Sequence, residues 1–168
     1  KDGHLAGQVI ALKILYPHIA VSAEAFARFR NEVSVTRRLS HPAIVQTFGF
    51  GRTEGGLPYM AMEYVPGQTL RKHIMAQSGV LAFEQALKIL FQVAAGLNFA
   101  HGHGVIHRDL KPENVLVLSD GIVKIADFGL AQMFREESRL TKTGNIVGTP
   151  LYMSPEQIRT VPLDARSD

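Results

Sequence analysis

A charged loop in the second half of the chain carries the residues best suited to chemistry. The stretch His107 to Asn114 reads HRDLKPEN and stands between two apolar runs, which indicates a loop held rigidly at a functional site. Asp109 and Asn114 belong to this loop, and Asp127 follows the apolar segments after it. Two carboxylates and an amide at strand ends supply hard oxygen ligands, which suit Mg²⁺ sharing its other positions with waters and phosphates.

A lysine and a glutamate near the start of the chain suggest a second set of charges for the same site. Lys13 lies in the apolar stretch 9–15, which predicts a buried strand, and an unpaired buried ammonium group is unfavourable. Glu32, on the helix predicted next, is its candidate partner. Taken alone, each has a plainer explanation, because Lys13 could extend its charge to solvent and Glu32 could be a solvated helix residue. The carboxylates downstream favour the functional interpretation.

The elements that must position these residues follow from periodicity and from turn residues. Pro66-Gly67 predicts a hinge between two subdomains, and residues 130–150 predict a long loop, because they show little periodicity. One face of the long helix predicted over 83–101 is apolar: Leu87, Leu90, Phe91, Ala94 and Leu97. The predicted elements are strands over 9–15, 44–51, 57–65, 115–118 and 122–125, and helices from Ser22 to about Leu39, over 69–76 and over 83–101.

Composition excludes several classes of protein. The 168 residues are 46% hydrophobic and 20% charged, which excludes a disordered tail or a fibrous repeat. The absence of cysteine excludes a disulfide framework and a thiolate metal site, and fits a reducing compartment. A net charge of +3 is too small for a nucleic-acid groove. No uninterrupted apolar run approaches the roughly 20 residues of a membrane span, so we expect neither nucleic-acid binding nor membrane contact from this segment.

The ordered motifs resemble those of a eukaryotic-type (Hanks-type) serine/threonine protein kinase catalytic domain, and most of all its bacterial members. The matches lie in the family's order over nearly the whole chain. They are Ala11-Leu12-Lys13 (the lysine strand), Glu32 (the helix glutamate), His107 to Asn114 (the catalytic loop), Asp127-Phe128-Gly129 (the metal-binding motif) and Ser154-Pro155-Glu156, with serine for the family's alanine.

The resemblance implies a two-lobed α+β fold that is incomplete at both ends. Residues 1–65 would form the hinge and a small β-rich N-lobe that lacks its first strands. Residues 66–168 would form a helical C-lobe that lacks its last helices. The glycine-rich phosphate loop would be absent, so we expect the chain alone to be weakly active. Two buried positions of the family's hydrophobic spine, normally apolar, fall on Thr36 and Thr47.

The resemblance also implies roles for the residues of the site. Lys13 would hold the α- and β-phosphates and be oriented by Glu32. Asp127 and Asn114 would bind Mg²⁺, with Mn²⁺ as an alternative, and Asp109 would accept or orient the proton of the substrate hydroxyl. His107 would be a packed, structural histidine.

Two further residues bear on the substrate. Lys111 would neutralise charge on the γ-phosphate, and its spacing from Asp109 is typical of serine/threonine kinases. Thr149, in Gly148 to Tyr152, would bond Asp109 and Lys111. The implied adenine pocket consists of Ala11, Met62 at the gatekeeper position, the hinge from Glu63 to Val65, Leu116 and Ala126.

These roles predict an ATP-dependent protein serine/threonine kinase with protein substrates. Transient kinase dimers would autophosphorylate Thr141 or Thr143, with Ser138 a weaker candidate. We expect a cytoplasmic location, although the full-length protein could be membrane-anchored elsewhere. A pseudokinase is the main alternative, yet Lys13, Asp109 and Asp127 are all present. A small-molecule phosphotransferase is the third, although such enzymes tend to lack Lys111 and the segment 149–156.

Overall fold

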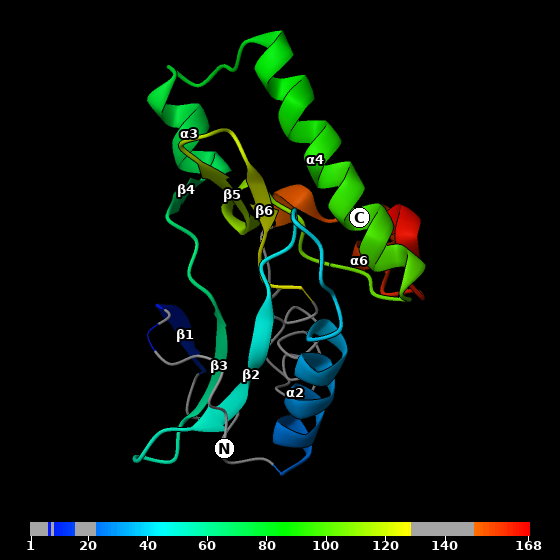
Figure 1. Cartoon of the computed structure of the whole chain (residues 1–168). Helices are drawn as coiled ribbons and strands as arrows, with labels where there is room; N and C mark the ends of the chain where they lie inside the picture. The colour runs from blue at the N-terminus through cyan, green and yellow to red at the C-terminus, as the bar shows by residue number, and fades with distance from the viewer. Residues whose placement is uncertain (1–6, 8, 16–22, 129–149) are drawn as a thin grey trace.

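The computed structural model describes residues 7, 9–15, 23–128 and 150–168. Each of its two antiparallel sheets has three strands, in the orders β1-β3-β2 and β4-β5-β6. The first sheet and α2 occupy one end of the molecule, and the second sheet, α3 and α4 the other (Figure 1). The described elements are β1 (Ile10–Ile14), α2 (Ala23–Thr36), β2 (Thr47–Arg52), β3 (Pro58–Glu63), β4 (Gly67–Thr69), α3 (Leu70–Ala76), α4 (Phe83–Gly102), η1 (Pro112–Asn114), β5 (Val115–Leu118), β6 (Val123–Ile125), η2 (Pro150–Tyr152), α6 (Pro155–Arg159) and η3 (Ala165–Ser167).

The first sheet places Lys13 on an inward face. Side chains alternate along β1, so Lys13 shares its face with Ala11, whereas Leu12 and Ile14 are exposed. Helix α2 buries Phe29 and Val33 against this sheet. Phe29 and Val33 form one small core with Leu15, which directly follows β1, and with Met60 of β3.

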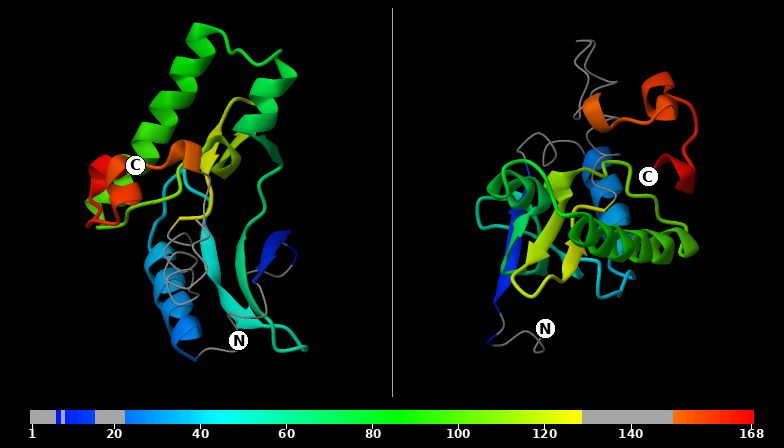
Figure 2. Two further views of the ribbon diagram at one scale, coloured as in Figure 1. Left: turned by 180° about the vertical axis from the view of Figure 1, so that it is seen from behind. Right: turned by 90° about the horizontal axis from the view of Figure 1, so that it is seen from above.

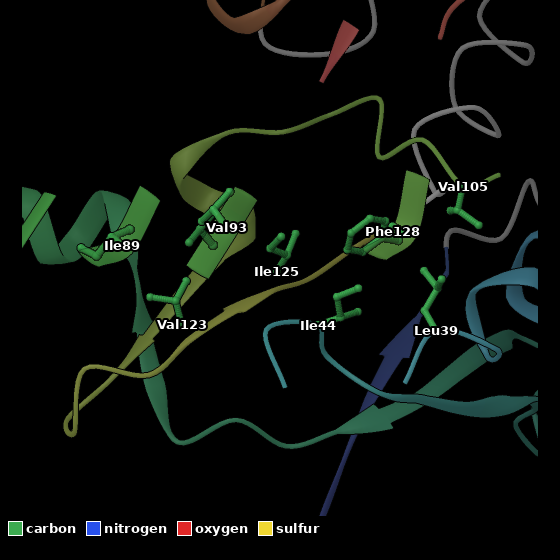
Figure 3. Packing of buried hydrophobic residues seen from close by; sticks show 10 residues of the cluster. Leu39, Ile44, Ile89, Val93, Val105, Val123, Ile125 and Phe128 are labelled. Carbon is green, nitrogen blue, oxygen red and sulfur yellow. The ribbon is translucent and has the colours of Figure 1, made fainter. Parts of the chain in front are cut away.

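The second core lies between α4 and the sheet of β4, β5 and β6. Figure 3 shows Ile89 and Val93 of α4 near Val123 and Ile125 of β6, and α4 packs along β6 (Figure 2). A short segment before β2 ties the two ends of the molecule together, because Val45 donates to the Ile125 carbonyl at 2.9 Å and Ile125 donates to the Ala43 carbonyl at 2.8 Å.

The apolar face predicted for the long helix lies largely outside the core. Residues Leu87, Leu90 and Phe91 are exposed, and the buried positions of α4 are instead Ile89, Val93, Gly96 and Ala100. Both stripes are apolar, so periodicity alone could not tell which one faces the sheet. None of the described helices is both long and apolar enough to cross a membrane.

Two smaller corrections concern strands. The strand predicted over 44–51 begins at Thr47, and Ile44 instead forms an isolated parallel bridge with Ile125. Where Pro66-Gly67 predicts only a break, β4 begins at Gly67 and pairs with β5. A Cβ atom at Gly67 would lie 2.7 Å from the Val117 carbonyl oxygen, so this strand can approach β5 because residue 67 has no side chain.

Gly67→Ala is therefore expected to destabilise the protein by about 1–3 kcal/mol, because the backbone of β5 must shift to admit a methyl group. The matched control is Gly102→Ala at the end of α4, where a Cβ atom would meet nothing within 4 Å. Urea unfolding of both variants measures the difference, and equal midpoints would contradict the close approach of β4.

Candidate active site

Strand β1 and the segment after β6 bring together two of the predicted site residues. Lys13 Nζ lies 2.6 Å from Asp127 Oδ1. Asp127 has a left-handed backbone with φ of 64°, a conformation that a non-glycine residue keeps only when its surroundings hold it. The predicted pairing of Lys13 with Glu32 stays a prediction, and Glu32 is half-buried on α2.

The loop between α4 and β5 holds the Asp109 carboxylate from two sides. Lys111 Nζ lies 2.7 Å from Asp109 Oδ2. Asn114 Nδ2 donates to the Asp109 carbonyl oxygen at 2.8 Å and to Oδ2 at 3.0 Å. Because its nitrogen makes both bonds, the amide oxygen of Asn114 takes no part in them, and an amide oxygen is a type of ligand that suits a hard cation.

The loop and the Asp127 segment are joined through the backbone. Ala126 N–H donates to the Asn114 carbonyl oxygen at 2.8 Å. Carboxylate and amide oxygens from Asp109, Asn114 and Asp127 thus come from adjoining segments, and this donor set fits a hard divalent cation that retains waters. Within the described ranges there is no group of three or more His, Cys, Asp or Glu residues that would hold a metal by itself.

His107 has the structural role that the sequence predicts. Its side chain is fully buried, and its ring packs edge-on against Phe128 with centroids 4.7 Å apart. The His107 ring accepts a hydrogen bond from Asp109 N–H at Nδ1, 3.2 Å away, so Nε2 carries the proton and donates to the Ala126 carbonyl at 2.8 Å. Burial lowers the pKa of His107, which keeps the ring neutral.

Asp168 is a functional residue that sequence reasoning missed. Its carboxylate, 1% exposed, accepts hydrogen bonds at 2.7 Å from both His107 N–H and Arg108 N–H, and it lies 2.8 Å from His101 Nε2. No local signal marks a carboxylate whose partners lie some sixty positions earlier. His103, which lies near His101 at the end of α4, contacts the Phe99 carbonyl oxygen through Nδ1 at 2.8 Å.

The site has two buried polar atoms for which no described residue provides a hydrogen-bond partner. They are Nε of Arg108 and Oε2 of Glu156. Arg108 adjoins Asp109 and has a left-handed backbone with φ of 70°. A buried guanidinium nitrogen without an acceptor favours an anion at this position.

The predicted adenine residues are brought together in part. Ala11 of β1 pairs with Met62 of β3, and Leu116 lies on β5. Met62 lines a cavity that reaches Asp127 and Phe128; Thr36 and Thr47 also line it. Ala11, Val65 and Leu116 do not line this cavity. The contact of these residues and of Met62 with adenine stays a prediction.

The side chain of Glu63 has a role that the sequence did not predict. It lies 2.9 Å from Lys124 Nζ of β6 and accepts a hydrogen bond from Gln46 N–H at 3.2 Å. The predicted hinge is therefore attached to the segment that leads into Asp127. Thr149 and the predicted phosphorylation sites Thr141 and Thr143 lie outside the described residues.

The arrangement is that of a kinase-like α+β domain. The sequence model for the protein kinase domain matches residues 3–168, and the chain belongs to this family. It is 39% identical over 173 residues to the serine/threonine-protein kinase PknB of Mycobacterium leprae, covering 98% of this chain and 28% of that protein. It is 37% identical to a probable serine/threonine-protein kinase of Clostridium acetobutylicum, covering 98% and 24%.

Solved structures agree with this assignment. The kinase domain of PknI from Mycobacterium tuberculosis matches with a TM-score of 0.75 and 32% identity, over 95% of this chain and 58% of that one. The chain thus spans about a quarter of the length of the curated relatives and somewhat more than half of the solved domain.

Proposed function

We propose that this chain carries the catalytic residues of a protein serine/threonine kinase, which transfers the γ-phosphoryl group of ATP to serine or threonine hydroxyls of protein substrates. The observation that carries the proposal is the Asp109 carboxylate, held by Lys111 and Asn114 and joined through Ala126 to the Lys13–Asp127 ion pair. Phosphoryl transfer depends chiefly on positioning and electrostatic stabilisation, and this loop positions a base among cations.

The residues proposed to bind ATP and its metal ion form one group. Asp127 and Asn114 would hold Mg²⁺ (or Mn²⁺), which when bound neutralises charge on the phosphates. Lys13 would bind the α- and β-phosphates, with Glu32 orienting it. Adenine would lie against Ala11, Met62, Leu116 and the backbone from Glu63 to Val65.

At the other side of the transferring group, Asp109 would accept or orient the proton of the substrate hydroxyl. As the hydroxyl oxygen forms its bond to phosphorus, the bond to the ADP oxygen breaks. Lys111, 2.7 Å from Asp109 in the structure, would neutralise charge on the γ-phosphate, and Thr149 would bond both side chains. We further propose that residues 1–65 and 66–168 form the two lobes, and that the domain acts in the cytoplasm.

We also propose autophosphorylation on Thr141 or Thr143 between transiently paired kinases. A phosphothreonine carries a charge of about −2 and would pair with Arg108, whose Nε atom is buried with no acceptor among the described residues. We expect the full-length protein, incubated with ATP and Mg²⁺, to gain phosphate in the peptide spanning 138–149.

Mass spectrometry tests both the activity and the sites. Phosphate in this peptide should be absent from both the double variant Thr141→Ala/Thr143→Ala and Asp109→Asn. Transfer to a serine peptide should fall to background in Asp109→Asn and persist in the double variant. An active protein without phosphate in residues 138–149 would contradict the autophosphorylation sites. No transfer to any serine or threonine substrate would contradict the proposed function itself.

A further inference from the structure

The peptide group that leads into Asp109 is held at both ends. Its N–H, that of Asp109, donates to Nδ1 of His107 at 3.2 Å. Its carbonyl, that of Arg108, accepts a hydrogen bond of 2.6 Å from Nε2 of Gln157, which lies 49 positions later on α6. The orientation of this peptide therefore depends on a residue from the segment after Asp127 as well as on the catalytic loop.

Gln157 makes this bond with an amide that also caps its own helix. Its Oε1 accepts from Ser154 N–H at 3.0 Å, and the Ser154 hydroxyl accepts from Gln157 N–H at 3.3 Å, which completes a capping box. The side chain is buried, 8% exposed. Its orientation is unique, because exchanging oxygen and nitrogen would set donor against donor at Ser154 and acceptor against acceptor at Arg108.

This double contact explains why residue 157 is a glutamine. A capping box is served equally by glutamate or glutamine at this position. An ionised glutamate has no proton to donate, so it could cap α6 but would repel the carbonyl of Arg108. Only an amide of this length satisfies both partners at once.

The contact matters because Arg108 is in an unfavourable conformation. Its φ of 70° is left-handed, which a long side chain adopts only where surrounding contacts enforce it. Asp168 holds its N–H and Gln157 holds its carbonyl. Releasing the carbonyl would let the peptide rotate, and the carboxylate of Asp109 would move with it.

We propose that Gln157 is a positioning residue for Asp109, through which the placement of α6 sets the geometry of the catalytic loop. The inference rests on the proposed kinase activity for its kinetic consequence, but its structural consequence can be measured without activity. Gln157 does not touch the reacting atoms, so we expect it to affect kcat and not the KM for ATP.

Three variants of the full-length protein separate positioning from capping. Gln157→Glu keeps the acceptor for the cap and loses the donor to Arg108. Gln157→Met loses both without adding a charge. Ser154→Ala removes the hydroxyl of the cap, leaves the bond to Arg108 intact and introduces the alanine usual in this family.

We expect Gln157→Glu and Gln157→Met to lower kcat by about 10- to 100-fold, as small misplacements of a catalytic group do, with the KM for ATP unchanged. Ser154→Ala should stay within about twofold of the wild type, because a cap hydroxyl affects helix stability alone. If Gln157 served only the cap, Ser154→Ala would lower kcat more than Gln157→Glu, and Gln157→Glu would be harmless.

Hydrogen exchange at residues 107–109, followed by mass spectrometry, gives a readout independent of catalysis. Exchange at these amides should be faster in the two Gln157 variants than in Ser154→Ala, and thermal melts identify a variant that has failed to fold. If Gln157→Glu does not fold, the comparison of Gln157→Met with Ser154→Ala tests the proposal. An inactive wild type would overturn the proposed function while this comparison still tests the coupling. An active wild type with unchanged kcat and exchange in both Gln157 variants would overturn the coupling.

Discussion

Replacing Asp127 by alanine is expected to lower the rate of phosphate transfer by at least about 100-fold, as removal of one preorganised electrostatic group typically does. The variant removes the partner that lies 2.6 Å from Lys13 Nζ and one of the oxygen ligands of the proposed cation site. The ammonium of Lys13 would then lose the carboxylate that it contacts in the structure. Initial rates of transfer to a serine peptide, at saturating ATP and Mg²⁺ in the full-length protein, measure the effect.

The matched control for this prediction is Glu54→Ala, which removes an exposed carboxylate from the turn between β2 and β3. It should leave the rate within about twofold of the wild type, because an exposed charge outside the site contributes little to the stability of the fold. A melting curve close to that of the wild type would show that Asp127→Ala is folded. If the folded variant kept more than about a tenth of the wild-type rate, the role of Asp127 at the cation would be wrong.

Asp168→Ala is expected to reduce both stability and activity, because three donors lose their common acceptor. The backbone N–H groups of His107 and Arg108 and the ring of His101 all meet this carboxylate, which is 1% exposed. A buried donor left without a partner costs about 1–3 kcal/mol. We therefore expect the free energy of unfolding to fall by about 3 kcal/mol or more, with loss of phosphate transfer under conditions where the variant remains folded.

Asp164→Ala provides the control within the same turn. Its carboxylate is 57% exposed and pairs with the exposed side chain of Arg166 at 2.7 Å. Asp164 also caps η3 by accepting from Arg166 N–H, so its loss should cost about 1 kcal/mol or less. Urea unfolding of both variants distinguishes them, and equal destabilisation would show that Asp168 does not hold the catalytic loop.

Much of the site was predictable because its residues form contiguous motifs. The stretch His107 to Asn114 is a polar loop between the end of α4 and the buried strand β5, and Asp127 lies two residues after the buried strand β6. The pairing of Lys13 with a carboxylate also followed from burial, because a half-buried ammonium group needs a partner. The structure supplied Asp127 as that partner.

Other features depend on how distant segments meet. The apolar stripe of α4 that faces β6 could not be chosen from its sequence, since Leu90 and Phe91 are as apolar as Ile89 and Val93 but are exposed. Likewise, Glu63 resembles any strand-end glutamate until β6 brings Lys124 to within 2.9 Å of it.

The sequence by itself determined the family, the order of the motifs and the identity of the reactive side chains, because these lie within short stretches whose chemistry is local. Only the tertiary structure decided how the catalytic loop is held. Asp168 and Gln157 reach it from 49 to 61 positions away, and a buried acceptor or donor is indistinguishable in sequence from a solvated one. A backbone group far along the chain gives no sign in the sequence of which side chain will reach it, so such supports become visible only when the chain is folded.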